Sequence, residues 1–177
     1  MNVPYYSQMK DVRDPYWKNK ACGIVVLKMA LDYFNGKITT PNLEELINEG
    51  QKIGAFSSQG WIHDGLVFIA HNHGLPAHKE EFRSTDPKWQ ENLQEIGLIK
   101  IKKNLKENNP VVVSVTKQFA LNGAHHLVLL TGADDEGFYY HDPDSQKSQT
   151  GANLFIEEAK FLKNWRRLAI FFYKKVL

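Results

Sequence analysis

Three apolar stretches in the second half of the chain decide the fold: Val111-Val112-Val113-Ser114-Val115, His126-Leu127-Val128-Leu129-Leu130-Thr131-Gly132 and Phe138-Tyr139-Tyr140-His141. The first follows Pro110 and is rich in β-branched residues, which is typical of a buried strand. The second and third flank Asp134-Asp135-Glu136-Gly137, whose composition is typical of a hairpin turn. Together with a last strand over residues 167–176, these stretches predict an antiparallel sheet.

The residues before Pro110 show helical spacing instead. The segment Cys22 to Phe34 is nearly all apolar and is followed by Gly36, which predicts a buried helix. Thr40 and Pro41 resemble an N-cap and a first-turn proline. We expect helices at 41–50, 61–73, 89–96, 98–105 and 155–162. Helices first and an antiparallel sheet second is an α+β pattern, and the absence of repeats and linkers predicts one domain over residues 1–177.

Composition excludes several classes of protein. The chain has 177 residues, of which 42% are hydrophobic and 24% charged, so it is neither disordered nor fibrous. A net charge of +2 gives no reason to expect binding to nucleic acid. A single cysteine excludes internal disulfides and multi-cysteine metal clusters. We expect no cofactor and no metal. We interpret four histidines that are clustered in the sequence as surface residues: His63, His71, His73 and His78. We interpret five aromatic residues as part of the core: Trp61, Phe68, Trp89, Trp165 and Phe171.

The N-terminal sequence predicts the compartment. It has no basic start followed by an apolar run, so it does not resemble a signal peptide. No window reaches the roughly 20 apolar residues of a membrane helix. We therefore expect a cytoplasmic protein without membrane insertion, or a secreted one if a signal peptide has been removed.

Cys22 is the first candidate for chemistry. It lies where the polar segment 18–21 meets the buried helix, and the positive end of a helix dipole favours the thiolate. Gly23 follows it and would let a substrate approach the backbone closely. A free cysteine is also a common core residue, so two interpretations of Cys22, filler and nucleophile, remain open.

A cysteine nucleophile needs a base and a group that orients the base. His126 begins a strand after the small residues 122–124, whereas His125 should point to the opposite face of that strand. Asp142 ends the returning strand of the hairpin, so register counting places it near His126. A carboxylate there would hold the imidazole in the useful tautomer. Gln8, in an extended upstream segment, is the candidate oxyanion donor together with the Cys22 backbone N–H.

These residues, in order, resemble the papain-like bacteriocin-processing peptidase family, and more closely its stand-alone peptidase-like branch. The resemblance rests on five motifs: Val3-Pro4-Tyr5-Tyr6-Ser7-Gln8, Cys22-Gly23, Gly60-Trp61, the strand 110–115 and the two hairpin strands with Asp142-Pro143. It implies a bacterial papain-like cysteine peptidase with a catalytic triad of Cys22, His126 and Asp142, and with Gln8 in the oxyanion hole. His126 matches the family histidine six residues before Gly132, so His125 is the second choice.

The resemblance and the residues leave several functions open. The main expectation is a hydrolase that cleaves a peptide or amide bond of a peptide or protein substrate through a thioester. The alternatives are an acyl or peptidyl transferase that uses the same residues and an inactive peptide-binding module. The residue after Gly23 is Ile24, where many relatives carry proline, and the insert 10–20 separates Gln8 from Cys22. Specificity is expected in the loops 10–20, 117–122 and 144–152, and the oligomeric state is open.

Overall fold

The computed structural model describes residues 1–145 and 150–174. Its centre is a six-stranded sheet in the order β3-β8-β4-β5-β6-β7, and every neighbouring pair is antiparallel. The strands are β3 (Ala77–Glu81), β4 (Val111–Thr116), β5 (His125–Ala133), β6 (Gly137–His141), β7 (Leu154–Glu157) and β8 (Trp165–Phe172). The predicted strands β4, β5 and β6 are confirmed, whereas β3 had no recognisable pattern because its residues are mostly charged.

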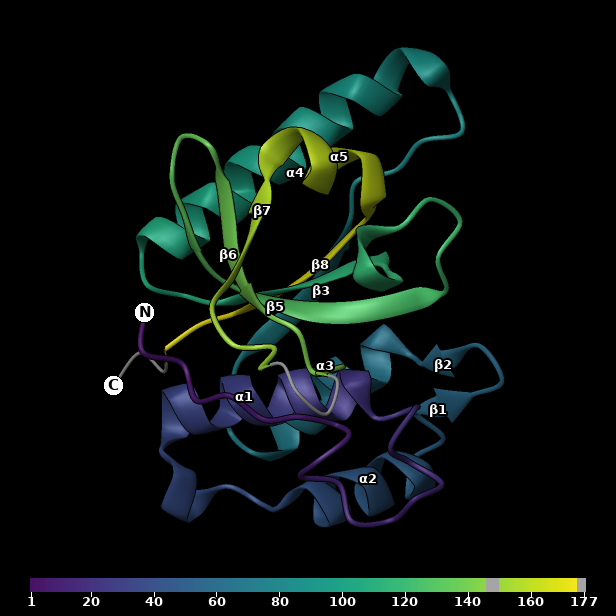
Figure 1. Cartoon of the computed structure of the whole chain (residues 1–177), viewed down its shortest axis with the longest axis vertical. Helices are drawn as coiled ribbons and strands as arrows, with labels where there is room; N and C mark the ends of the chain where they lie inside the picture. The colour runs from purple at the N-terminus through teal and green to yellow at the C-terminus, as the bar shows by residue number, and fades with distance from the viewer. Residues whose placement is uncertain (146–149, 175–177) are drawn as a thin grey trace.

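Helices cover both faces of the sheet, as Figure 1 shows. On one side lie α1 (Cys22–Asn35), α2 (Leu43–Lys52) and α3 (His63–Asn72), and on the other lie α4 (Pro87–Lys106) and α5 (Glu158–Asn164). Two short 3-10 turns follow α1 and β4: η1 (Lys37–Thr39) and η2 (Lys117–Phe119). Alternate residues of β4 enter two separate cores, Val112 on the α1 side and Val113 on the α4 side. The α+β expectation is therefore confirmed.

Several predicted helix boundaries were wrong, for local reasons. Helix α2 begins at Leu43 because Asn42, not Thr40, is its N-cap and exchanges hydrogen bonds with Glu45 in a capping box. The two helices expected over 89–105 are one helix, α4, which starts at Pro87 after the N-cap Asp86. The spacing of the apolar residues in 89–96 and 98–105 did not indicate that the two segments form one continuous helix.

Two segments predicted as helix begin as strand. Trp61 belongs to β2 (Gly60–Trp61), which pairs with β1 (Phe56–Ser57), and α3 starts only at His63. Residues 155–157 lie in β7, paired with β6, before α5 begins. The last strand, β8, starts at Trp165, two residues earlier than predicted, and ends at Phe172; the predicted extension to 176 runs partly outside the described residues. In each case, pairing with a neighbouring strand determines where the strand begins.

The expected aromatic core is only partly correct. Trp61, Trp165 and Phe171 are buried, whereas Phe68 and Trp89 are 52% and 50% exposed on the outer sides of their helices. Helix α1 is also less uniform than its composition suggested, because a buried ion pair of 2.5 Å joins Lys28 to Asp32. The Tyr6 hydroxyl donates a hydrogen bond to Asp32, which fastens the N-terminal segment to the helix.

Among residues 1–145 and 150–174, no helix is both long enough and apolar enough to cross a bilayer.

Candidate active site

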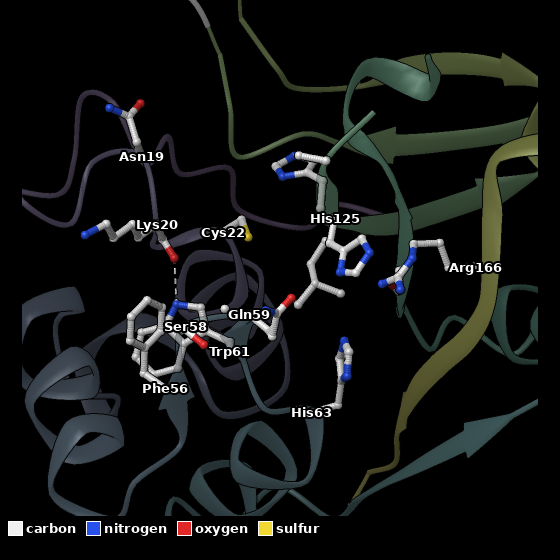
Figure 2. A pocket seen from close by; sticks show the side chains of 15 residues that line it. Asn19, Lys20, Cys22, Phe56, Ser58, Gln59, Trp61, His63, His125 and Arg166 are labelled. Atoms are coloured by element: carbon white, nitrogen blue, oxygen red, sulfur yellow. Dashed lines mark hydrogen bonds between the residues drawn. The ribbon is translucent and has the colours of Figure 1, made fainter. Parts of the chain in front are cut away.

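Cys22 is the first residue of α1 and opens onto a cavity between α1 and the sheet. The helix follows Ala21, and no side chain caps its start. Cys22 is a free, half-buried thiol whose sulfur points into the space between α1 and the sheet (Figure 2). The cavity has a volume of about 470 Å³, and segments 19–22, 56–61, 124–127, Ser114, His63 and Arg166 contribute to its walls. The thiol therefore packs against the core on one side and is accessible to a molecule in the cavity on the other.

His126 lies on the sheet side of the cavity and is bonded to Asp142. Its Nε2 atom is 2.7 Å from Asp142 Oδ1, and the two residues are only 4% and 9% exposed. In the β5–β6 ladder Leu129 pairs with His141, so Asp142 lies diagonally across from His126. A bulge between Leu130 and Gly132 shifts this register by one residue. The expectation that His126 and Asp142 are neighbours is confirmed, although simple hairpin counting would misplace the partner.

A dense set of hydrogen bonds holds Asp142 in place. Its carboxylate also accepts from the backbone N–H of Asp144 at 2.8 Å. Its carbonyl accepts from the Tyr5 hydroxyl at 3.1 Å, and its N–H donates to the Gly151 carbonyl at 2.8 Å. A Cβ atom on Gly151 would lie 1.9 Å from the Asp142 carbonyl oxygen, so only glycine fits there. The carboxylate is thus held by His126 and Asp144, and the backbone of Asp142 is held by Tyr5 and Gly151.

The electrostatics of the buried pair favour a charged imidazolium. Burial acts to lower the pKa of His126, but hydrogen bonds and charge interactions with Asp142 and Cys22 outweigh it and raise the pKa to about 10. For Asp142, burial acts to raise the pKa, but the hydrogen bond and charge of His126 hold the pKa below its usual value. The thiol of Cys22 is therefore close enough to His126 to influence its protonation.

His125 occupies a different place from His126. The His125 side chain is exposed. Because side chains alternate along a strand, we expected only one of the two histidines to face the thiol. Both residues nevertheless line the cavity, because it lies at the end of β5, where side chains from both faces reach it. Burial, and then the charge of Arg166, lower the pKa of His125. Of these two histidines, only His126 has a carboxylate partner among the described residues.

Gln8 lies beside the Asp142 segment and is almost fully buried. Its backbone N–H donates to the Pro143 carbonyl at 2.8 Å, and its side-chain Nε2 donates to Asp144 Oδ1 at 3.1 Å. Lys117 holds the other oxygen of Asp144 at 2.8 Å. Gln8 is not one of the residues that line the cavity, and its Oε1 has no partner among the described residues. The structure thus brings Gln8 to the hairpin end, while its oxyanion role stays a prediction.

The glycine after the thiol has a packing role that the sequence did not suggest. A Cβ atom on Gly23 would lie 2.9 Å from Trp61 Cβ, and one on Gly50 would lie 2.4 Å from the ring of the same tryptophan. Two glycines therefore make room for Trp61, whose indole N–H donates to the Lys20 carbonyl at 2.7 Å. The expectation that Gly23 admits substrate is wrong, because Trp61 fills that space and forms a wall of the cavity.

The four clustered histidines lie apart from one another. His73 pairs with Glu49 at 2.6 Å, His71 contacts the Ala77 carbonyl, and His78 stacks on Tyr173. His63, which we interpreted as a surface residue, instead lines the cavity. Among residues 1–145 and 150–174 no group of three or more metal-ligating side chains comes together.

Other residues of the cavity wall were not predicted from the sequence. Arg166 on β8, Ser114 on β4 and the β1–β2 turn with Gln59 all reach it. They lie far apart in the sequence and match no motif; the sheet order β8-β4-β5 brings Arg166 and Ser114 together, whereas the β1–β2 turn belongs to a separate two-stranded sheet. Of the loops expected to determine specificity, 10–20 contributes Asn19 and Lys20, whereas 146–149 lies outside the described residues.

Comparisons with known proteins give the family and the fold of this chain. The family model described as "Peptidase_C39 like family" matches residues 1–169. A protein from Bacillus anthracis described as a C39-like peptidase superimposes with a TM-score of 0.69 at 20% identity, over 99% of this chain and 96% of that one. A comparison with curated proteins found no significant match.

Two transporter peptidases share the fold. A double-glycine-motif protease from an AMS/PCAT transporter, solved with its leader peptide, has a TM-score of 0.61 at 18% identity and covers 98% of this chain and 93% of its own. The peptidase domain of Streptococcus ComA, a bifunctional ABC transporter, has a TM-score of 0.62 at 17% identity, with coverage of 89% and 93%. The papain-like fold that the motifs implied is confirmed, and the match over residues 1–169 shows that this chain belongs to the Peptidase C39-like family.

Proposed function

We propose that this protein is a cysteine peptidase in which Cys22 is the nucleophile, His126 the general base and acid, and Asp142 the residue that orients His126. The observation that carries the proposal is the buried 2.7 Å hydrogen bond between His126 and Asp142 beside the free thiol at the start of α1. A thiol, an imidazole and a carboxylate in this order form the nucleophile–base–orienter arrangement of acyl transfer.

The reaction follows from these positions. His126 takes the proton of Cys22, and the thiolate attacks the carbonyl carbon of the scissile amide. The tetrahedral intermediate collapses when His126 returns the proton to the leaving nitrogen, which breaks the C–N bond and leaves a thioester on Cys22. His126 then takes a proton from water, the resulting hydroxide attacks the thioester carbonyl, and the acid product leaves as Cys22 regains a proton. The imidazolium that forms is stabilised by the neighbouring Asp142 carboxylate.

Two groups are proposed to bind the oxyanion. One is the backbone N–H of Cys22, which lies at a helix start that no side chain caps. The other is the side-chain amide of Gln8, which carries two N–H groups, one of which is bonded to Asp144. Removing one such donor costs about 3 kcal/mol of transition-state stabilisation in well-studied enzymes.

The first experiment measures the reactivity of the thiol. Because Cys22 is the only cysteine, iodoacetamide labelling followed by intact-mass measurement reports on it alone. We expect alkylation at pH 7 to be faster than that of glutathione, and the advantage to fall more for His126→Gln than for His125→Gln. If Cys22 reacts no faster than glutathione, the activated pair is absent and the chain is better described as a peptide-binding module.

The second experiment measures turnover. A mixed peptide library is incubated with the protein, and new termini are identified by mass spectrometry, with Cys22→Ala as the control. We expect cleavage products with the unmodified chain and none with Cys22→Ala. Added amine acceptors distinguish the alternative activity, because a transferase yields amide products where a hydrolase yields free carboxylates.

A further inference from the structure

The cavity beside Cys22 has an unusual balance of charge. Its walls contain three histidines, Arg166 and Lys20, and none of the described lining residues is an aspartate or a glutamate. A peptide backbone alone gives no reason for such a bias. A cavity of one sign favours ligand groups of the opposite sign.

Arg166 is the fixed charge that faces the cavity. Figure 2 shows its side chain extending from β8 into the cavity, towards the histidine side of the site, and His63 approaching the same space from α3. The Lys20 side chain extends the other way, and its Nζ atom lies 3.4 Å from the centre of the Tyr16 ring. Lys20 is therefore already engaged elsewhere, and Arg166 remains as the cation on this wall.

The guanidinium of Arg166 lacks a carboxylate partner within the described chain. Its hydrogen bond is to the neutral Ser114 hydroxyl at 3.2 Å. The two carboxylates that act on neighbouring His63 are already paired, Asp64 with Lys79 at 2.8 Å and Glu81 with Arg83 at 2.5 Å. Burial, and then the charge of Arg83, lower the pKa of Arg166, so the surroundings disfavour its charge. An anion bound in the cavity would offset that cost.

The neighbouring histidines provide neutral hydrogen-bonding groups. Burial is the main cause that lowers the pKa of both His63 and His125, with further contributions from Lys79 and Arg166 for His63 and from Arg166 for His125. At neutral pH both rings are therefore uncharged, and each offers one N–H group. Across the cavity, Trp61 and Phe56 form an aromatic wall, with ring centres 5.1 Å apart. Beside the charged His126, the site thus combines the Arg166 cation, neutral donors and an apolar wall.

We propose that Arg166, together with His63 and His125, binds a carboxylate of the substrate, and that the preferred substrates are peptides with an aspartate or glutamate side chain near the scissile bond. This inference rests on the proposed function, because it places the carboxylate within the cavity onto which Cys22 opens. A guanidinium can bind a carboxylate with two parallel hydrogen bonds, which makes it selective for that group over an amide. Trp61 and Phe56 contact the aliphatic part of the bound peptide.

The test measures binding, so that it does not depend on turnover. The full chain carrying Cys22→Ala is immobilised and presented with a randomised peptide library at neutral pH. We expect retained peptides to be enriched in aspartate and glutamate at one position. Retention without acidic enrichment overturns the inference, and so does an absence of retention. Alkylation and turnover of the unmodified chain test the proposed function separately, so the two failures are distinguishable.

A matched peptide pair then identifies the residue responsible. Two peptides that differ only by glutamate or glutamine at the enriched position are titrated by fluorescence anisotropy. We expect the glutamate peptide to bind at least about tenfold more tightly, as is usual for a charged over a neutral hydrogen-bond partner. Arg166→Gln should reduce the ratio to about one, and Arg166→Glu should favour a lysine peptide instead. Arg13→Gln, at an exposed site away from the cavity, should keep the ratio.

A further comparison decides whether the bound carboxylate belongs to a side chain or to the C-terminus of the peptide. Each peptide is also made with an amidated C-terminus. If the preference survives amidation, the bound group is the side chain; if it follows the free C-terminus, the cavity recognises a terminal carboxylate and the side-chain proposal is overturned. A preference that persists unchanged in Arg166→Gln, with thermal unfolding showing that this variant is folded, would also overturn it.

Discussion

The two sides of the cavity differ in how completely their polar groups are paired. At the hairpin end, His126 and Asp142 are buried, bonded to each other, and fastened by Tyr5, Asp144 and the backbone of Gly151. At the β8 wall, Arg166 is half-buried and holds only a serine hydroxyl. The first side is fixed before any substrate arrives, as catalytic geometry requires. The second has unused bonding capacity, as a recognition surface requires.

The largest effect is expected from a substitution at the hairpin end of the cavity. His126→Gln removes the proposed base, which is worth up to roughly 10⁴-fold in rate. His125→Gln leaves the Asp142 partner in place and should cost much less. The measurement is kcat/KM on a peptide found by the library, with alkylation of Cys22 as a second readout. If the two variants lose the same activity, the contact with Asp142 does not distinguish the base, and the assignment of His126 as the base is wrong.

A smaller effect concerns the oxyanion donor. Gln8→Ala removes the side-chain amide and should lower kcat by roughly 10²–10³-fold with little change in KM. Gln8→Glu, which replaces the N–H donors with acceptors beside Asp144, should be at least as damaging. Steady-state kinetics separate the two constants. A rise in KM with kcat unchanged would place Gln8 in ground-state binding and refute the oxyanion role.

A third prediction concerns the packing between the two sides. Gly23→Ala places a Cβ atom 2.9 Å from Trp61, and overpacking of this kind costs typically about 1–3 kcal/mol of unfolding free energy. Gly132→Ala is the matched control, because its Cβ would meet nothing closer than 3.5 Å. Urea unfolding measures both. If the two variants are equally stable, Trp61 can move away from α1 and is not a rigid wall.

The last prediction concerns the pH dependence of stability. The pKa of His126 is raised from 6.5 to about 10, so its contribution is complete below about pH 6.5 and is lost as the pH rises through 10. The pKa of Asp142 is lowered, so its contribution is present above about pH 4 and is lost as the pH falls further. Unfolding temperatures should therefore decline from pH 6.5 to 10. The decline should be shallower in Asp142→Asn, and identical slopes would contradict the pairing.

The antiparallel strands and the thiol helix could be predicted because their signals are local. Residues 111–115 are β-branched and follow a proline, and Cys22 to Phe34 is apolar beyond what a surface helix shows. The strands β3 and β7 could not be predicted in this way. Residues 77–81 are mostly charged but pair with β8, and residues 155–157 have helical spacing but pair with β6. Strand pairing supplied hydrogen bonds that local propensity does not include.

The sequence by itself determined the family, the pattern of helices first and antiparallel sheet second, and the four residues proposed for chemistry. These depend on short motifs that can be recognised in the sequence alone, such as Cys22-Gly23 and Asp142-Pro143. Only the tertiary structure decided that Asp142 meets His126 diagonally across a bulge, that Gly23 makes room for Trp61, and that Arg166 shares a cavity with the thiol. The physical reason is that register, close packing and unpaired charge arise between segments distant in sequence, and each depends on the sheet order.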